Sequence, residues 1–100
     1  MELTKEVVGR KKSFKLDGRF TAADTIKFRE IITTLESGDF DEVELDMNGV
    51  DYVDSAALGM FLIAREQSEK NRVKIKILNV KDQPEKAFSV SKFDTLFDLG

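Results

Sequence analysis

Four short stretches of the chain have the apolar pattern of β-strands. Residues 3–8 are predicted to form the first strand, and a turn at residues 9–11 leads into a stretch where Phe14 and Leu16 alternate with polar side chains. Gly18 is expected to end this second strand. The same alternation, with a period of two residues, predicts two further strands at residues 43–47 and 73–77.

The two later strands carry opposite charges on their polar faces. Glu44 and Asp46 occupy alternate positions in one strand, and Lys74 and Lys76 do so in the other. If these strands are neighbours, each exposed pair contributes about 0.2–1 kcal/mol and helps to fix the register. One face of the sheet is therefore predicted to meet water, while the other meets helices.

A helix is predicted over residues 22–37, between the second and third strands. Its apolar residues follow Phe28 at the spacing i, i+3, i+4 and i+7, which places them on one helical face. Thr21 and Asp24 resemble a capping box, with Asp in place of the usual Glu or Gln. Gly38 is placed to end the helix in a left-handed conformation.

Further helices are predicted in the second half of the chain. Residues 55–70 form the second helix, which ends near Asn71. Pro84 suits the first turn of a third helix, with Asp82 as its cap. Apolar contacts for one or two short C-terminal helices are supplied by Phe88, Phe93, Leu96 and Phe97.

The order of these elements is β-β-α-β-α-β-α-α. It predicts an α/β fold in which a single mixed sheet of about four strands carries three to four helices, mainly on one face. The length of 100 residues fits one compact domain, so residues 1–100 are expected to form a single domain.

Composition narrows the possible functions. The chain has 16 Lys and Arg against 19 Asp and Glu. Its one basic run, Arg10 to Lys12, is best explained as a solvated turn. No nucleic-acid partner is therefore expected. The sequence contains no cysteine or histidine, which excludes a disulfide, a thiol nucleophile, a Cys/His zinc site and a Ser-His-Asp triad. No apolar run is long enough to span a bilayer and no signal peptide is recognisable, so we expect a cytoplasmic protein without membrane insertion.

The most informative segment is residues 50–62. It leaves a strand, offers Asp54 or Ser55 as the N-cap of the second helix, and continues into nine residues, 56–64, without a polar side chain. A helix resting on a sheet needs only one apolar stripe, so part of this surface is free to bind a partner. Without a family resemblance, a capping residue and small side chains packed on a sheet are the favoured explanation of the segment.

Residues 54–59, Asp-Ser-Ala-Ala-Leu-Gly, resemble the Asp-Ser-Ser/Thr-Gly-Leu-Gly signature of the STAS domain, the anti-sigma factor antagonist family. The similarity extends to residues 16–20, which resemble the Leu-x-Gly-x-Leu/Phe element before the first helix of that family. Residues 45–53 resemble the strand and loop before the signature, and residues 93–97 resemble the closing apolar turn. The resemblance therefore covers nearly the whole chain.

This resemblance implies a phosphorylation switch at Ser55. In the family, a partner serine kinase, often an anti-sigma factor, phosphorylates the serine after the Asp, and a PP2C-type phosphatase removes the phosphate. Ala56 and Ala57 depart from the family pattern, but neither change removes the acceptor hydroxyl. The chain is expected to supply a substrate hydroxyl rather than a catalytic group: it is not an enzyme, it needs no cofactor, and it lacks a Gly-rich phosphate loop.

The unmodified protein is expected to bind its partner and the phosphoprotein to release it, because an unpaired phosphate buried in an interface is costly. The expected contact surface is the start of the second helix, the loop before it and one rim charge near the first helix. Its residues are Asp24, Asp51, Tyr52, Asp54, Ala56, Gly59, Met60 and Ile63.

Three other functions stay open. A response-regulator receiver needs an acidic pair after its first strand, where this chain has Gly9 and Gly18. Asp46, Asp51 and Asp54 could hold magnesium or calcium in a metal-dependent enzyme, although acidic loop residues are ordinarily solvated. Within the STAS resemblance, the chain could be an unphosphorylated subunit of a transporter or signalling scaffold, an alternative that the serine at position 55 disfavours.

Overall fold

The predicted strands join in one mixed sheet in the computed structural model, which describes residues 1–95 and 97–99. The strand order is β1-β2-β3-β4-β5; β1 runs antiparallel to β2, and the other neighbours are parallel. The strands are β1 (Glu2–Val8), β2 (Lys11–Phe20), β3 (Glu42–Val53), β4 (Lys74–Leu78) and β5 (Asp98–Leu99).

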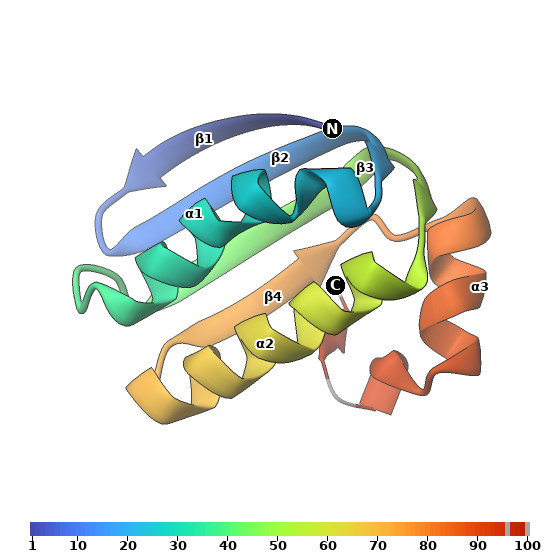
Figure 1. Ribbon diagram of the computed structural model, residues 1–100. Helices are drawn as coiled ribbons and strands as arrows, with labels where there is room; N and C mark the ends of the chain where they lie inside the picture. The colour runs from blue at the N-terminus through green and yellow to red at the C-terminus, as the bar shows by residue number, and fades with distance from the viewer. Residues whose placement is uncertain (96, 100) are drawn as a thin grey trace.

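The helices lie mainly on one face of this sheet, as predicted. Figure 1 shows α1 and α2 across that face, with α3 at the end of the molecule where α2 begins. The helical elements are η1 (Ala22–Asp24), α1 (Thr25–Glu36), α2 (Ser55–Asn71), α3 (Asp82–Val90) and η2 (Phe93–Thr95), the two η elements being short 3-10 turns. The predicted α/β fold is therefore confirmed.

The prediction that Gly18 ends the second strand is wrong. β2 continues to Phe20, and the pairing with β3 shifts register between Gly18 and Arg19. Gly18 has φ +94, a conformation open to glycine at little cost, so the strand bends here instead of stopping. This extension carries Phe20 into the core beneath the start of α2.

The first helix has the predicted ends. The Asp24 carboxylate accepts a hydrogen bond from the Thr21 backbone N–H at 3.0 Å, and the Thr21 hydroxyl accepts one from the Ala23 N–H at 3.4 Å. This capping box opens the 3-10 turn η1, and α1 follows directly. Gly38, with φ +78, lies two residues beyond the last helical residue, as expected of a left-handed terminator.

The C-terminal part differs from the prediction in two respects. Asp82 does not cap α3; it is the first helical residue, has φ +55, and the helix begins without a side-chain cap. Pro84 does lie in the first turn. The chain then ends in the short strand β5, which pairs with β4, rather than in helices alone. Phe88, Phe93 and Phe97 are buried as expected, while Leu96 lies outside the described residues.

Phe61 of α2 forms the centre of the core. Its ring lies 5.5 Å from that of Phe20 in β2, 5.3 Å from that of Phe28 in α1 and 5.2 Å from that of Phe88 in α3. Such edge-to-face contacts stabilise the fold beyond the area that they bury. Phe61 therefore fixes the first half of α2 against three other elements.

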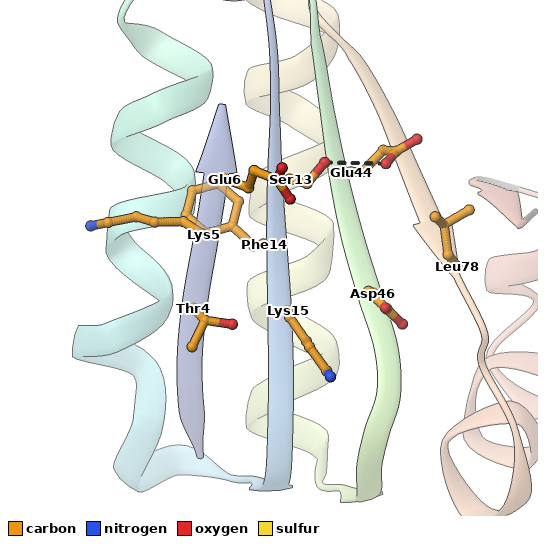
Figure 2. Close-up of a pocket in the computed structure, with 9 residues that line it drawn as sticks. All are labelled: Thr4, Lys5, Glu6, Ser13, Phe14, Lys15, Glu44, Asp46 and Leu78. Atoms are coloured by element: carbon orange, nitrogen blue, oxygen red, sulfur yellow. Dashed lines mark hydrogen bonds between the residues drawn. The ribbon is translucent and has the colours of Figure 1, made fainter. Parts of the chain in front are cut away.

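The helix-free face of the sheet is polar. Glu44 pairs in register with Lys76, so the predicted neighbourhood of β3 and β4 is confirmed, whereas Asp46 lies opposite Leu78. A shallow depression of about 290 Å³ occupies this face, and Figure 2 shows the Ser13 hydroxyl donating to the Glu44 carboxylate at 3.2 Å within it. Glu44 also forms an ion pair with Lys11 at 3.4 Å. Its carboxylate is thus held by partners on the neighbouring strand.

Candidate functional site

Ser55 is the first residue of α2, and it is exposed. β3 ends at Val53, so only Asp54 separates the strand from the helix. Of the two predicted caps, Asp54 is the one used: its Oδ1 accepts a hydrogen bond from the Ala57 N–H at 2.8 Å. The Ser55 hydroxyl makes no hydrogen bond to any residue of the described part of the chain, and it remains accessible to another protein.

Asp54 also holds a second element. Its Oδ2 accepts a hydrogen bond from the Ala22 N–H at 3.0 Å, at the start of η1. One carboxylate therefore joins two helix starts, where the orphan N–H groups and the helix dipole both favour a negative charge. These contacts give Asp54 a structural role, and the predicted partner contact stays a prediction.

Gln83 secures the other side of the site. Its side-chain oxygen accepts from the Val53 N–H at 2.9 Å, and its amide nitrogen donates to the Val53 carbonyl at 3.0 Å. β4 pairs with β3 only as far as Asp46, so the end of β3 has no β4 partner, and the Gln83 amide takes the place of a strand. Sequence reasoning missed this residue, because no pattern marks a side chain that pairs with a distant backbone.

A depression of about 450 Å³ lies between the end of β3, the start of α2, and α3. Its lining includes Ser55 of α2 and Lys86 of α3. The remaining lining residues combine apolar and polar side chains: Tyr52, Val53, Asp54, Leu58, Gln83, Ala87, Val90 and Ser91. The site is thus a shallow hollow beside an exposed hydroxyl, the shape of a docking surface rather than an enclosed active site.

Exposed apolar side chains occur on α1, α2 and α3. Ile63 is 41% exposed, as the predicted contact surface requires, while Met60 is half-buried and packs against the core. Sequence reasoning did not name Leu62, Ile26 or Val90 as contact residues, and they are 42%, 82% and 79% exposed. Ile26 falls outside the buried stripe of α1, so helical periodicity could have identified it.

Ala56 and Gly59, also predicted to contact the partner, are half-buried in the first two turns of α2. A Cβ added to Gly59 would meet no atom within 4 Å, so the helix surface is open at this point. Small residues here allow a partner backbone to come close to the helix.

Asp51 and Tyr52, which were predicted to lie in a loop before α2, belong to the end of β3, because the strand continues to Val53. Asp51 is exposed, whereas Tyr52 is half-buried and lies beneath the Arg19 guanidinium, 4.5 Å from the ring centroid. This cation–π contact joins the ends of β2 and β3 and orients the tyrosine ring.

Asp24, the predicted rim charge, is buried, with an exposed fraction of 8%. Burial opposes its ionisation, but hydrogen bonds from the Thr21 N–H and from the N-terminal ammonium at 3.1 Å outweigh this and lower the pKa of Asp24 below its usual value. Its carboxylate thus has structural partners, and the binding role stays a prediction.

The acidic residues do not assemble a metal centre within residues 1–95 and 97–99, where no group of three or more His, Cys, Asp or Glu is placed to hold an ion. Asp46 accepts instead from the Asn48 N–H and the Asn79 amide, both at 2.9 Å. In the same part of the chain, no helix combines the length and apolarity needed to cross a membrane.

The model of the STAS domain family matches residues 2–100. A STAS-domain containing protein of Pseudomonas aeruginosa is 26% identical over 91 residues, which cover 91% of this chain and 89% of the relative. These matches span nearly the whole chain, and they therefore exclude the alternative that the chain is a response-regulator receiver.

Solved structures have the same fold. SpoIIAA, an anti-sigma factor antagonist and cell fate determinant of Bacillus, is 17% identical in both its unphosphorylated and phosphorylated forms, each with a TM-score of 0.78. These matches cover 99% of this chain and 87% and 91% of the two SpoIIAA chains. A sulfate transporter family protein of Wolinella succinogenes is 18% identical with a TM-score of 0.77, over 92% of this chain and 75% of that one.

Proposed function

The chain belongs to the STAS domain family, and from that premise we propose that it is a cytoplasmic regulatory module of the anti-sigma factor antagonist type. In this proposal it binds a protein partner while Ser55 is unmodified and is released when Ser55 is phosphorylated. The partner is an anti-sigma factor with serine kinase activity, and a PP2C-type phosphatase restores the binding form.

The observation that carries this proposal is the exposed hydroxyl of Ser55 at the first residue of α2. Asp54 takes over the capping of the helix, so the serine is not needed for it. Exposed apolar side chains supply contact area: Val90 lines the hollow, and Leu62 and Ile63 lie further along α2. SpoIIAA, which has this fold, exists in both an unphosphorylated and a phosphorylated form.

The switch works through the cost of burying charge. A phosphate adds about −1.5 to −2 charges at neutral pH. On the exposed start of α2 it stays in contact with water, so the fold accepts it. At a complementary interface it would be buried without a partner group, which costs several kcal/mol. Since each 1.4 kcal/mol is about a tenfold change in the dissociation constant, binding weakens by orders of magnitude.

The chemistry of the transfer belongs to the partner. The kinase supplies nucleotide, magnesium and the base that takes the serine proton, and this chain supplies the accepting oxygen. The sequence has no histidine to act as a base beside Ser55, and both oxygens of Asp54 already accept backbone hydrogen bonds. Ser55 is therefore a phosphoryl-accepting substrate group and not a catalytic nucleophile of this protein.

An affinity pull-down from cells identifies the partner, and titration of the purified partner measures the switch. Ser55→Ala is expected to bind like the wild type, and Ser55→Asp at least tenfold more weakly. Ser89→Asp is the matched control, since Ser89 is exposed on α3 and outside the lining of the hollow. Full affinity of Ser55→Asp for the partner would falsify the switch.

A second function is favoured by the likeness to the sulfate transporter family protein of Wolinella succinogenes. In this alternative the chain is an unphosphorylated subunit of a transporter or signalling scaffold. Co-purification separates the two proposals: a membrane transporter recovered with the chain supports the scaffold, and a serine kinase supports the switch. Mass spectrometry of the purified chain then shows whether position 55 is modified.

A further inference from the structure

The hollow beside Ser55 contains a cation that the switch described above does not use. Lys86 of α3 lines the same hollow as Ser55 and is the one lysine or arginine in its lining. We propose that Lys86 receives the phosphate on Ser55, forming an ion pair across the hollow between α2 and α3. This inference rests on the proposed function and adds the way in which the phosphorylated state is held.

Lys86 is available for this role. Its ammonium forms no ion pair with any carboxylate whose position is described in residues 1–95 and 97–99. The one acidic residue in the lining is Asp54, and both its oxygens accept backbone hydrogen bonds. A phosphate on Ser55 would therefore bring the first anion with free oxygens into the hollow.

The backbone at Lys86 is held in a fixed position relative to Ser55. Gln83, one helical turn before Lys86, makes two hydrogen bonds with Val53, two residues before Ser55. Phe88 of the same helix packs against Phe61 of α2 at 5.2 Å between ring centroids. These contacts join the helix that carries the lysine to the end of β3, directly before Ser55, and to the helix that carries the serine.

The ion pair would change the surface that a partner meets. Leu58 and Ala87 supply apolar lining, and the unmodified hollow accepts an apolar side chain there. A phosphate held by Lys86 fills the space above these residues with hydrated charge. The partner would then be released for two reasons: the phosphate occupies the hollow, and its charge at the edge of the hollow opposes burial in the interface.

The pair is measurable in the isolated phosphoprotein. Phosphoserine incorporated at position 55 during translation gives a single ³¹P resonance, whose pH titration reports the second phosphate pKa, about 6 when unperturbed. An ion pair near the surface lowers this pKa, so Lys86→Met is expected to raise it by about 0.3–0.7 units above the wild-type value. Lys86→Arg keeps the charge and is expected to keep the low pKa.

Lys70→Met is the matched control, because Lys70 is exposed in the last turn of α2, away from the hollow. It removes the same charge and is expected to leave the phosphate pKa unchanged. Circular dichroism verifies that each variant is folded. An identical phosphate pKa in the wild type and in Lys86→Met overturns the inference, as does an equal rise in Lys70→Met.

The two proposals fail in different experiments. The phosphate titration needs neither kinase nor partner, so it tests the ion pair alone. Weakened partner binding by Ser55→Asp, together with an unperturbed phosphate pKa, would remove only the role of Lys86. A shifted phosphate pKa in a protein whose partner binds Ser55→Asp at full affinity would remove only the switch.

Discussion

At the scale of single residues, Asp54 contributes more to the site than its place before the serine suggests. The sequence offered Asp54 or Ser55 as the cap of α2, and the structure uses Asp54 for two helix starts at once. Its second contact, with the Ala22 N–H, joins residues 32 positions apart and leaves no trace in local sequence. This division of roles, with the cap on one residue and the free hydroxyl on the next, is what makes Ser55 available.

Asp54→Ala is expected to lower the free energy of unfolding by about 1–2 kcal/mol, since it removes a helix cap and leaves the Ala22 N–H without its acceptor. Urea denaturation measures the change. Asp51→Ala is the control: Asp51 is exposed near the end of β3, three residues before Asp54, so its loss is expected to change stability by at most about 0.5 kcal/mol. Equal effects of the two substitutions would contradict the double cap.

Asp24 makes stability depend on pH. Burial opposes its charge, but the Thr21 N–H and the N-terminal ammonium lower the pKa of the folded carboxyl below the ordinary value of 3.8. A group with a lowered folded pKa contributes stability that is complete above the unfolded pKa and is lost as the pH falls through the folded one. The contribution of Asp24 is therefore present at pH 7 and declines below about pH 4.

Asp24→Asn is accordingly expected to be less stable than the wild type at pH 7, with a difference that narrows at pH 3. Chemical denaturation at pH 7, 5, 4 and 3 tests this. Asp39→Asn serves as the control, because Asp39 is exposed in the loop after α1. A stability difference between Asp24→Asn and the wild type that is constant from pH 7 to 3 would show that the charge of Asp24 is not involved.

At the scale of elements, periodicity predicted the presence and order of the strands and helices with a repeating pattern, although β3 continues to Val53, six residues beyond its predicted end. The order of β1 to α3, the neighbouring positions of β3 and β4 and the helix-covered face all follow from periodicity and from residues such as Thr21 and Gly38. The exceptions are positions without a repeat. β5 has two residues, which are too few to show alternation. Glycine can either end a strand or let it bend, and at Gly18 the strand bends and continues.

Prediction of the functional site from sequence has the same limit. Ser55 was recognised because it stands in a motif, and its exposure agrees with the role predicted for it. Gln83 and Lys86 were not recognised, because the chain brings α3 to the site from 30 residues away, as the contact between Gln83 and Val53 shows. Side chains that meet only in three dimensions, without a repeat or a motif, are beyond reasoning from a single sequence.

Gly59→Ala separates the stability of α2 from its use as a surface. The added methyl group meets no atom within 4 Å, and alanine is favoured over glycine inside a helix, so stability is expected to rise by about 0.5–1 kcal/mol. Gly59 is also a proposed contact residue, so the same methyl group is expected to weaken partner binding. Thermal unfolding and partner titration measure the two effects, and a rise in both stability and affinity would exclude Gly59 from the interface.

At the scale of the whole molecule, the packing of Phe61 indicates that the proposed phosphorylation of Ser55 would act at the surface and not through the core. Its ring contacts phenylalanines from β2, α1 and α3, so α2 cannot shift without disturbing three elements. Close-packed interiors resist such movement. Ser55 lies outside this cluster, and a phosphate there does not reach the core.

The phosphoprotein is therefore expected to keep the fold of the unmodified protein. Amide ¹H–¹⁵N spectra of the two forms should differ around residues 52–58 and 83–91, which border the hollow, and coincide over β1 and α1. Ser89→Asp, which adds charge to α3 outside the lining, provides the reference for purely electrostatic shifts. Changes that spread through β1 and α1 would mean that phosphorylation rearranges the core, and the partner would then be recognising a change of conformation rather than a charge.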